Sequence, residues 1–378
     1  MMNRAYKYRL YPTTEQTDLI NKNIGCSRFI YNHFLALAKS DGYLNYNQYA
    51  KALPLLKKAY PFLKEVESTS LQQTLKDLDK SFARFFKKSG GFPNFKSKRN
   101  PKQSYRCQMV NNNIKITDNY IKLPKLGLVK FAKSREVEGR ILNVTISRTK
   151  TNKFYISICV ETEIDTMPSS SYEIGMDLGL KDYLVTTQGL VVPNPKHFRK
   201  YEGQLAKAQR RLSKKKKGSQ NYKKAKLQVA LLHERIANAR KDFLHKLSTT
   251  IVVENQTILV EGLKPKNMIK NRRLSKSIAD ASWGRFLNML EYKSSWYGRN
   301  YIQVDTFFPS SQLCSNCGYI NQNTKKLHIR TWECPSCFAF HQRDENAAKN
   351  IKAEGLRIAS SLYASRVLEL PDFKPVES

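Results

Sequence analysis

Three acidic residues stand where a lone carboxylate is costly. Asp177 lies inside an apolar stretch flanked by glycines, Glu261 ends a second apolar stretch, and Asp344 begins a predicted helix. Taken singly, they are explained as a turn acid, a strand-end acid and a helix N-terminal acid. If the two stretches are strands that end at one sheet edge, however, Asp177 and Glu261 meet there, and Asp344 arrives from a flanking helix.

Carboxylates held this close repel one another unless divalent cations neutralise them. Hard oxygen ligands and a phosphate substrate suit two Mg²⁺ ions about 4 Å apart, one activating water and the other stabilising the leaving oxygen. The acids therefore predict a metal-dependent phosphodiesterase.

Four of the seven cysteines form two matched C-x-x-C knuckles with 16 residues between them: Cys314, Cys317, Cys334 and Cys337. Two such knuckles fit a tetrahedral site for one Zn²⁺, and four protein ligands close the coordination, so the ion is structural. A redox C-x-x-C pair is the competing interpretation, but the matched knuckles favour zinc. The other three are isolated and are expected to be small buried thiols: Cys26, Cys107 and Cys159. The pattern indicates a reducing, intracellular compartment.

The chain has 378 residues, and its 66 Lys and Arg against 31 Asp and Glu give a formal charge of +35. Such an excess predicts a polyanionic partner, because ordinary solubility needs far less charge. A membrane surface also attracts cations. The sequence nevertheless contains no run of about 18 apolar residues and does not start like a signal peptide, so we expect no membrane partner and a cytoplasmic location.

Residues 196–226 hold 13 basic residues and a single acid, Glu202, with aromatic residues interleaved. A charge run is usually a solvated face, but this density favours a track for a phosphate backbone. A basic loop at 96–99 and the segment between the cysteine knuckles add further cations. The residues expected from charge to contact nucleic acid are Lys96, Lys98, Arg99, Arg210, Arg211, Lys214, Lys215, Lys216, Lys217 and Arg330.

Two kinds of element must position these residues. In the first half, residues 3–12 alternate as a strand, Thr13 and Gln16 form a capping box that opens a helix, and residues 67–88 form a second long helix. Short strands follow at 114–116, 120–123, 128–131, 141–147 and 154–162. They predict a small antiparallel barrel, completed by the first strand, with the helices inserted.

After residues 167–171, a predicted linker, strands and helices alternate. Strands are expected at 172–178, 183–187, 257–261 and 301–307, and helices at 197–217, 221–250, 281–297 and 344–361. This order predicts an α/β domain whose sheet is interrupted by a long basic helical pair.

Several motifs, in order along nearly the whole chain, resemble one family. They are YKYRLYPTTEQ, RFIYNHFL, GFPNFKSKR, IGMDLGLKDYLVTTQG, the stretch from SKSIADASWG to QLCSNCG, RTWECPSC and HQRDENAAKNI. The chain resembles the transposon-encoded TnpB proteins, compact RNA-guided DNA endonucleases regarded as ancestors of type V CRISPR effectors.

The resemblance implies a multidomain α+β fold. Its parts are a β-barrel wedge domain at 1–12 and 100–166, a helical recognition domain at 13–99, a RuvC (RNase H-like) α/β nuclease domain at 172–308 and 339–370, a zinc ribbon at 309–338 and a tail at 371–378. The nuclease acids of the family fall on Asp177, Glu261 and Asp344. Relatives often carry Asp where Gln342 stands, but the metal-binding Asp before Glu345 is present.

The resemblance also implies partners. They are a guide RNA derived from the transposon end and a double-stranded target DNA with an adjacent motif, bound by a monomeric protein. Residues expected to read that motif are Tyr46, Thr69, Gln72 and Asn111. Because Val110 and Ser68 stand where relatives carry polar contacts, the motif is expected to differ. Two alternatives remain: an RNA-guided repressor without nuclease activity, and a transposase that joins strands.

Overall fold

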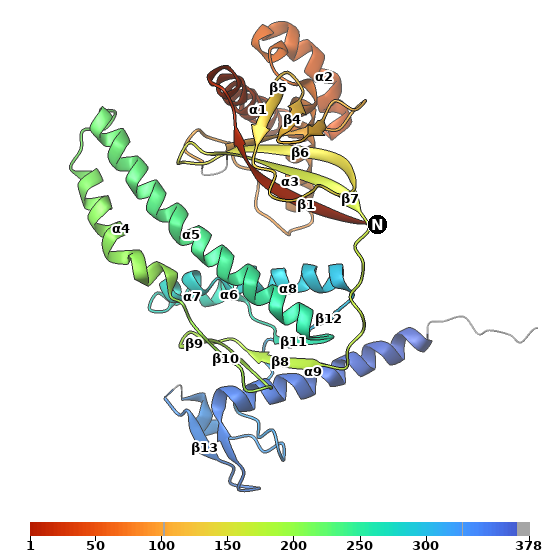
Figure 1. The fold of residues 1–378 in the computed structure, drawn as a ribbon, viewed down its shortest axis with the longest axis vertical. Coiled ribbons are helices and arrows are strands. Elements are labelled where there is room, and N and C mark those ends of the chain that lie inside the picture. The colour runs from red at the N-terminus through yellow and green to blue at the C-terminus, as the bar shows by residue number, and fades with distance from the viewer. Residues whose placement is uncertain (101–102, 327, 369–378) are drawn as a thin grey trace, which may run out of the picture. The chain divides into compact units, whose positions relative to one another are not determined.

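The computed structural model describes residues 1–100, 103–326 and 328–368 (Figure 1). The chain divides into two compact units, Met1–Glu163 and Ile164–Ser378. The predicted tail at 371–378 lies outside the described residues. Among the helices that the structure describes, none combines the length and apolar character needed to cross a membrane.

The first unit is built on a seven-stranded antiparallel sheet in the order β2-β6-β7-β1-β5-β4-β3. The strands are β1 (Met2–Tyr11), β2 (Gln103–Gln108), β3 (Lys115–Thr117), β4 (Tyr120–Leu123), β5 (Gly127–Phe131), β6 (Arg140–Arg148) and β7 (Phe154–Thr162). Strand β1 therefore pairs with strands from far along the chain, as predicted. Alternate residues of β1, among them Tyr6, Tyr8 and Leu10, are buried in the core of this sheet.

The predicted barrel does not close, because β2 and β3, at the two ends of the order, are not paired. The register gives the reason. Strand β1 pairs with β7 over nine positions, but with β5 only through Leu10 and Tyr11 at its end. The three strands from β3 to β5 are therefore attached to the tip of β1, and they do not continue around a cylinder.

Helices α1 (Thr14–Ser40), α2 (Tyr46–Ala59) and α3 (Ser68–Phe86), with a short 3₁₀ turn at Pro61–Lys64, lie between β1 and β2 in sequence. The capping box of Thr13 and Gln16 opens α1 as predicted. Helix α1 serves two cores: Ile20 and Ile24 pack with the sheet, and its second half packs with α2 and α3.

The second unit has a five-stranded sheet in the order β10-β9-β8-β11-β12 (Figure 1). Its strands are β8 (Glu173–Asp177), β9 (Asp182–Thr186), β10 (Val191–Pro193), β11 (Thr257–Glu261) and β12 (Asn300–Val304). Strands β8, β11 and β12 run parallel, whereas β9 pairs antiparallel with both β8 and β10.

Six helices accompany this sheet: α4 (His197–Ser213), α5 (Gln220–Glu254), α6 (Pro265–Met268), α7 (Ser275–Ala281), α8 (Trp283–Tyr297) and α9 (Arg343–Leu368). Residues of α5 and α8, such as Leu244 and Phe286, pack on one face with Ile258, while Ile351 of α9 packs with Leu259 on the other. The sheet is thus enclosed by helices on both faces.

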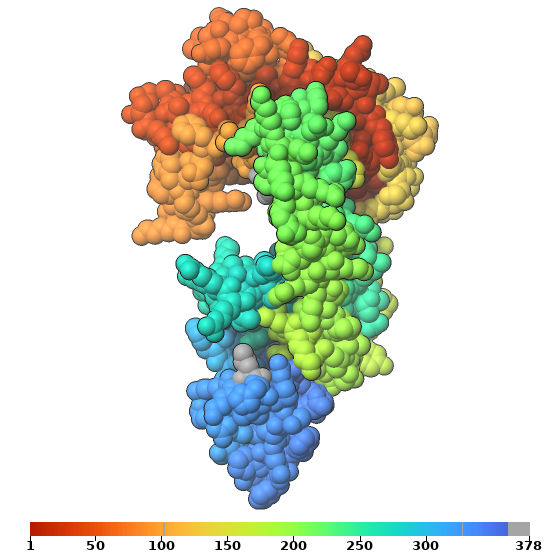
Figure 2. All heavy atoms as spheres, turned by 90° about the vertical axis from the view of Figure 1, so that its left-hand side faces the viewer, coloured from red at the N-terminus to blue at the C-terminus, as the bar shows by residue number. Residues whose placement is uncertain are grey.

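Two parts of the second unit extend from this core. Helices α4 and α5 form a long two-helix hairpin (Figure 1). Between β12 and α9 the chain forms a small lobe with a 3₁₀ turn at Gln322–Lys325 and the hairpin of β13 (Thr331–Glu333) and β14 (Phe340–Gln342), coloured blue in Figure 2.

Candidate active site and metal centre

Asp177 and Glu261 lie at the carboxyl ends of two neighbouring parallel strands. Asp177 is the last residue of β8, and Glu261 is the last residue of β11. The register aligns Met176 with Val260, so the two acids follow at the same level of the sheet. The sequence prediction that these strands end at one edge is therefore correct for this pair.

Two glycines bring α9 close enough to deliver the third acid. A side chain at Gly175 of β8 would collide with the carbonyl oxygen of Ala348 and with Lys352, both on α9. Gly355 of α9 makes the reciprocal approach, since a Cβ there would collide with Leu259 of β11. The absence of side chains lets the helix lie directly on the strands, and Asp344 is the second residue of that helix.

The three acids lie within electrostatic reach of one another. Burial first, and then the charges of Glu261 and Asp344, raise the pKa of Asp177 from 3.8 to about 8. Arg343 and Arg330 act in the opposite direction. Burial also raises the pKa of Glu261. A group of carboxylates this reluctant to ionise together suits a divalent cation, which neutralises them.

The acids are nevertheless less tightly gathered than the cysteines. Within the described part of the chain, the one group of three or more potential ligands whose atoms all lie within 4.8 Å of one another is the cysteine cluster. Asp344 instead contacts Arg330, whose Nη1 lies 3.3 Å from both of its carboxylate oxygens. The arginine expected to contact nucleic acid thus lies beside one of the acids.

Two other acids of the second unit, Asp280 and Asp305, have structural roles. Asp280 accepts a hydrogen bond from the backbone N–H of Phe198 at 2.8 Å and forms an ion pair with Arg240 at 2.7 Å. Asp305 accepts from the backbone N–H of Phe307 at 2.7 Å. Their carboxylates cap a helix and a turn.

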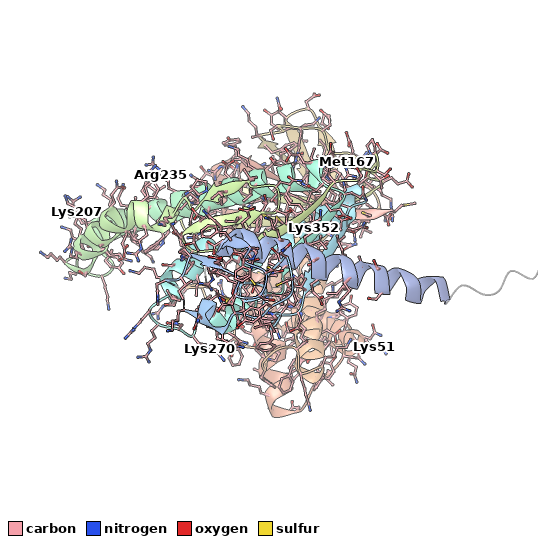
Figure 3. All side chains as sticks on the ribbon, turned by 90° about the horizontal axis from the view of Figure 1, so that it is seen from below. Lys51, Met167, Lys207, Arg235, Lys270 and Lys352 are labelled. Atoms are coloured by element: carbon pink, nitrogen blue, oxygen red, sulfur yellow. The ribbon has the colours of Figure 1, made fainter. Side chains whose placement is uncertain are left out.

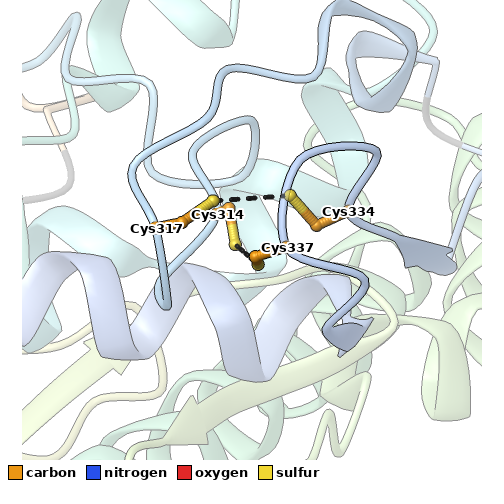
Figure 4. Close-up of side chains that lie close together, drawn as sticks. All are labelled: Cys314, Cys317, Cys334 and Cys337. Carbon is orange, nitrogen blue, oxygen red and sulfur yellow. Dashed lines mark hydrogen bonds between the residues drawn. The ribbon is translucent and has the colours of Figure 1, made fainter.

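The four knuckle cysteines converge, as Figure 4 shows. The Sγ atoms of Cys314 and Cys337 are 3.6 Å apart, as are those of Cys317 and Cys334. Four sulfurs at about 2.3 Å from a tetrahedral zinc ion lie roughly 3.8 Å from one another, close to this spacing. The donor set therefore fits one structural Zn²⁺.

Each knuckle makes the same backbone turn. Gly318 follows the first with a φ of +79°, and its N–H donates to the carbonyl of Cys314 at 2.9 Å. Phe338 occupies the equivalent position with a φ of +57°, and its N–H donates to Cys334, also at 2.9 Å. The first turn therefore has a glycine at its left-handed position, and the second turn is formed without one.

His341 is a neighbour of the cluster that sequence analysis did not identify. Its Nε2 lies 3.0 Å from the Sγ of Cys314, and its ring packs against Trp332 with centroids 4.7 Å apart. A buried imidazole beside a thiolate stabilises its charge and orients it. The signal available in the sequence was a histidine four residues after the last cysteine.

The residues expected to read a DNA motif lie on elements that meet within the first unit. The Oγ1 of Thr69, on α3, accepts from the backbone N–H of Gln108 at 3.2 Å, which ties α3 to the end of β2. Asn111 follows in an exposed turn with a φ of +48°. Gln72 is exposed on α3, and the ring of Tyr46 on α2 lies under an ammonium group of α3.

The basic residues differ in their exposure to solvent and in their partners. Lys98 and Arg99 are exposed, but Lys96 turns inward, with its Nζ 3.8 Å from the centre of the Tyr31 ring. On the α4–α5 hairpin, Lys207 and Arg235 project outward (Figure 3). Within the described residues, no carboxylate pairs with the six exposed cations near its tip, which are Arg210, Arg211, Lys214, Lys215, Lys216 and Lys217.

Comparison with protein families gives three matches along the chain. A family described as "Probable transposase" matches residues 157–272, one described as "Cas12f1-like, TNB domain" matches residues 283–351, and one described as "Helix-turn-helix domain" matches residues 1–42. A "TnpB-like protein" of Acanthamoeba polyphaga mimivirus is 28% identical over 227 residues, covering 55% of this chain and 42% of its own.

A "Putative RNA-guided DNA endonuclease" of Streptomyces pristinaespiralis is 38% identical over 365 residues, covering 94% of this chain and 90% of its own. The chain belongs to the TnpB family of RNA-guided DNA endonucleases. A TnpB-family relative from Escherichia coli (strain K12), the similarly named InsQ, is 33% identical over 378 residues and covers 93% of this chain and 92% of its own.

Among solved structures, the Cas12f1 chain of a Cas12f1–sgRNA–target DNA complex matches with a TM-score of 0.56 at 14% identity, covering 93% of this chain and 98% of that one. At this identity the match concerns the fold alone. This TnpB-family chain therefore has a Cas12f1-like fold of mixed α and β content, with a zinc-ribbon-like lobe that matches the TNB domain.

Proposed function

We propose that this chain cleaves target DNA by hydrolysing phosphodiester bonds at Asp177, Glu261 and Asp344, and that it is directed by a guide RNA derived from the transposon end. The supporting observation is the meeting of two parallel strand ends with the start of α9. The raised pKa of Asp177, at about 8, indicates that the acids share one electrostatic environment. The names of the relatives support the RNA and DNA partners.

The three carboxylates would hold Mg²⁺ ions, which supply the positive charge for activating water and stabilising the leaving oxygen. The chain's own contribution is to hold these oxygens on rigid elements. Asp177 and Glu261 are the last residues of two strands of the buried sheet, and Asp344 lies at the start of a helix packed on that sheet. Arg330 and Arg343 add positive charge beside the acids. That charge favours the approach of a phosphate group.

We assign the domains in line with this function. In the first unit, residues 1–12 and 100–166 would form the wedge domain and residues 13–99 the recognition domain, which reads the DNA motif next to the target. In the second, residues 172–308 and 339–370 would form a RuvC-type nuclease domain, interrupted by the zinc ribbon at 309–338. The mixed sheet covered by helices on both faces supports the nuclease assignment.

A cleavage assay tests the proposal. The ribonucleoprotein as isolated, with Mg²⁺ and a duplex that matches its RNA, should cut DNA, and Asp177→Ala should abolish cutting without weakening DNA binding. Glu173→Gln is a matched control at the opposite end of the same strand, where Glu173 pairs with Lys352 at 3.4 Å, and it should cut normally. Equal cutting by Asp177→Ala would refute the assignment.

The same reactions distinguish the two alternatives. A repressor would bind the duplex without nicking it at any Mg²⁺ concentration. A strand-joining transposase would convert labelled transposon-end DNA into longer products. The retention of all three acids supports hydrolysis over the first.

A further inference from the structure

One face of α1 borders an open hollow of about 440 Å³, which we call the α1 hollow. It is lined by Gly25, Arg28, Phe29, Asn32 and His33. These positions follow the three- and four-residue spacing of one helix face. All five are half-buried, so they are neither part of the deep core nor fully solvated.

Gly25 is unusual because it lies in the middle of a 27-residue helix. A helix-interior glycine costs about 0.5–1 kcal/mol relative to alanine. A Cβ at Gly25 would meet no heavy atom within 4 Å beyond its own helix turn. No packing contact within this unit therefore requires a glycine here, whereas close approach by another molecule would.

Arg28 faces the hollow with an unneutralised charge. Its Nη1 donates to the neutral Oε1 of Gln103 at 3.3 Å, and among the described residues no carboxylate forms an ion pair with it. Arg28 also lines a second, more enclosed cavity of about 170 Å³. The Oγ of Ser27, buried in that cavity's wall, has no hydrogen-bond partner. The hydroxyl of Ser27 belongs to that separate cavity, so in the α1 hollow itself the cation of Arg28 is the group open to an anionic acceptor from outside the chain.

Aromatic rings complete the face. Phe29 and His33 stack with centroids 6.0 Å apart and an angle of 21° between their planes. Tyr60 and Phe62 contact Phe29 edge-on and remain 40% and 41% exposed. Burial lowers the pKa of His33, which keeps the imidazole neutral and able to stack. Partly exposed rings beside an arginine that forms no ion pair among the described residues are a combination typical of sites for single-stranded nucleic acid.

We propose that the α1 hollow binds a single-stranded segment of the guide RNA, with its sugar–phosphate backbone passing over Gly25, a phosphate on Arg28 and a base against the Phe29 ring cluster. The inference rests on the proposed RNA partner. We assign RNA rather than DNA because stacking on aromatic rings beside an arginine is the usual way in which unpaired RNA bases are recognised, and the single-stranded DNA in the experiment below separates the two. A strand over Gly25 explains why the helix keeps a residue that destabilises it.

The experiment uses full-length protein stripped of RNA at high salt, and the RNA that copurifies with the wild type, sequenced and transcribed. We expect Gly25→Gln, which fills the hollow, to raise Tm by about 1–4 °C and to weaken RNA binding at least fivefold. Arg28→Gln keeps a polar group near Gln103 and should weaken binding about tenfold. Lys51→Gln, which removes an exposed charge on α2, is the matched control and should change binding less than twofold.

Binding of the two variants within twofold of wild type would overturn the inference. So would a loss seen only with a single-stranded DNA of the same sequence, because the occupant would then be DNA. A drop in Tm for Gly25→Gln would show that the glycine is needed by the fold itself, which also contradicts the proposal. These outcomes differ from failure of the proposed function, in which the wild-type ribonucleoprotein itself would not cut DNA.

Discussion

The guanidinium of Arg330 lies 3.3 Å from both carboxylate oxygens of Asp344. Arg330 precedes β13 in the zinc-ribbon lobe, and its backbone carbonyl accepts from the N–H of Arg343, the first residue of α9, at 2.8 Å. The lobe and the helix are thus joined beside the acid. The nearest positive charge to Asp344 among its ion pairs is therefore that of an arginine from the lobe.

Arg330 would compete with a bound cation for the carboxylate of Asp344. Arg330→Gln should therefore tighten Mg²⁺ binding. The side chains of Arg330 and Asp344 are 48% and 32% exposed, so the ion pair is worth at most about 1 kcal/mol. We therefore expect the Mg²⁺ dissociation constant to fall about two- to fivefold, measured by the rise of Tm during a Mg²⁺ titration. A weaker affinity in the variant would instead show that Arg330 helps to form the metal site.

Asp177→Asn should stabilise the metal-free protein and remove its response to Mg²⁺. Burial and then the charges of Glu261 and Asp344 raise the pKa of Asp177, so folding disfavours its charged form, and a neutral amide removes this cost. We expect a rise in Tm of about 2–4 °C without Mg²⁺. Mg²⁺ should then add little, because stabilisation by a ligand requires binding to the folded state. A calorimetric scan with and without Mg²⁺ measures both effects, and a lower Tm in the metal-free variant would contradict the prediction.

The positions of Asp177, Glu261 and Asp344 in the fold could be predicted from sequence because each stands at the end of a locally recognisable element. Strands β4, β7 and β11 begin and end at the predicted residues, and α1 begins at its predicted capping box. The apolar runs and caps that define these elements are properties of neighbouring residues, so they need no tertiary information. The scarcity of acids then made those at element ends conspicuous.

Other features were missed because they depend on distant residues. Helix α2 buries only Tyr49, Leu53 and Leu56 and contains Pro54, which weakens its hydrophobic pattern, although Asn45 and Gln48 form a capping box. Strands β13 and β14 have three residues each, too few for a periodic signal.

The failure of the barrel to close and the contact of Arg330 with Asp344 belong to this second class. Both follow from strand register and from the packing of remote segments. No local pattern in the sequence specifies them.

The cysteine cluster predicts one tightly bound zinc ion per chain. Elemental analysis of the purified protein should find one zinc per chain, and Cys334→Ser, which removes a fully buried ligand, should lose it. Because structural zinc contributes directly to folding, the variant should also be cleaved faster by protease within 309–342. Cys159→Ser is the control: this half-buried cysteine of β7 lies outside the cluster. Retention of a full zinc complement by Cys334→Ser would rule out the four-thiolate site.

The basic hairpin predicts a strong dependence of nucleic-acid binding on salt. Replacing Lys214, Lys215, Lys216 and Lys217 with glutamine should weaken RNA binding and flatten the plot of log affinity against log salt. Each phosphate that the protein no longer neutralises changes that slope by about 0.7–0.9. As a control, Lys115, Lys122 and Lys130, exposed on β3 to β5, should give a smaller change per charge when replaced by glutamine. An unchanged slope in the hairpin variant would mean that these lysines are surrounded by water and contact no phosphate.

Lys293 provides a test of stability against pH at a position outside the candidate site. Its ammonium is buried between α8 and α5 and donates to the His245 carbonyl at 2.9 Å, Ser248 Oγ at 2.7 Å and Thr249 Oγ1 at 2.6 Å. Despite these bonds, burial lowers its pKa from 10.5 to about 8. Between those two values the unfolded chain binds a proton that the folded chain does not. Folding stability from this group therefore rises with pH from about 8 to 10.5 and is lowest below 8.

Lys293→Met should remove this dependence. The variant should be more stable than the wild type at pH 7, and the difference should shrink as the pH approaches 10.5, because the wild-type lysine is then neutral in both states. The hydroxyls of Ser248 and Thr249 keep their own acceptors, the carbonyls of Leu244 and His245, so the substitution leaves neither without a partner. Urea unfolding at pH 7 and pH 9.5 measures the difference. A variant that is less stable than the wild type at pH 7 would show that the three hydrogen bonds outweigh the cost of burying the charge.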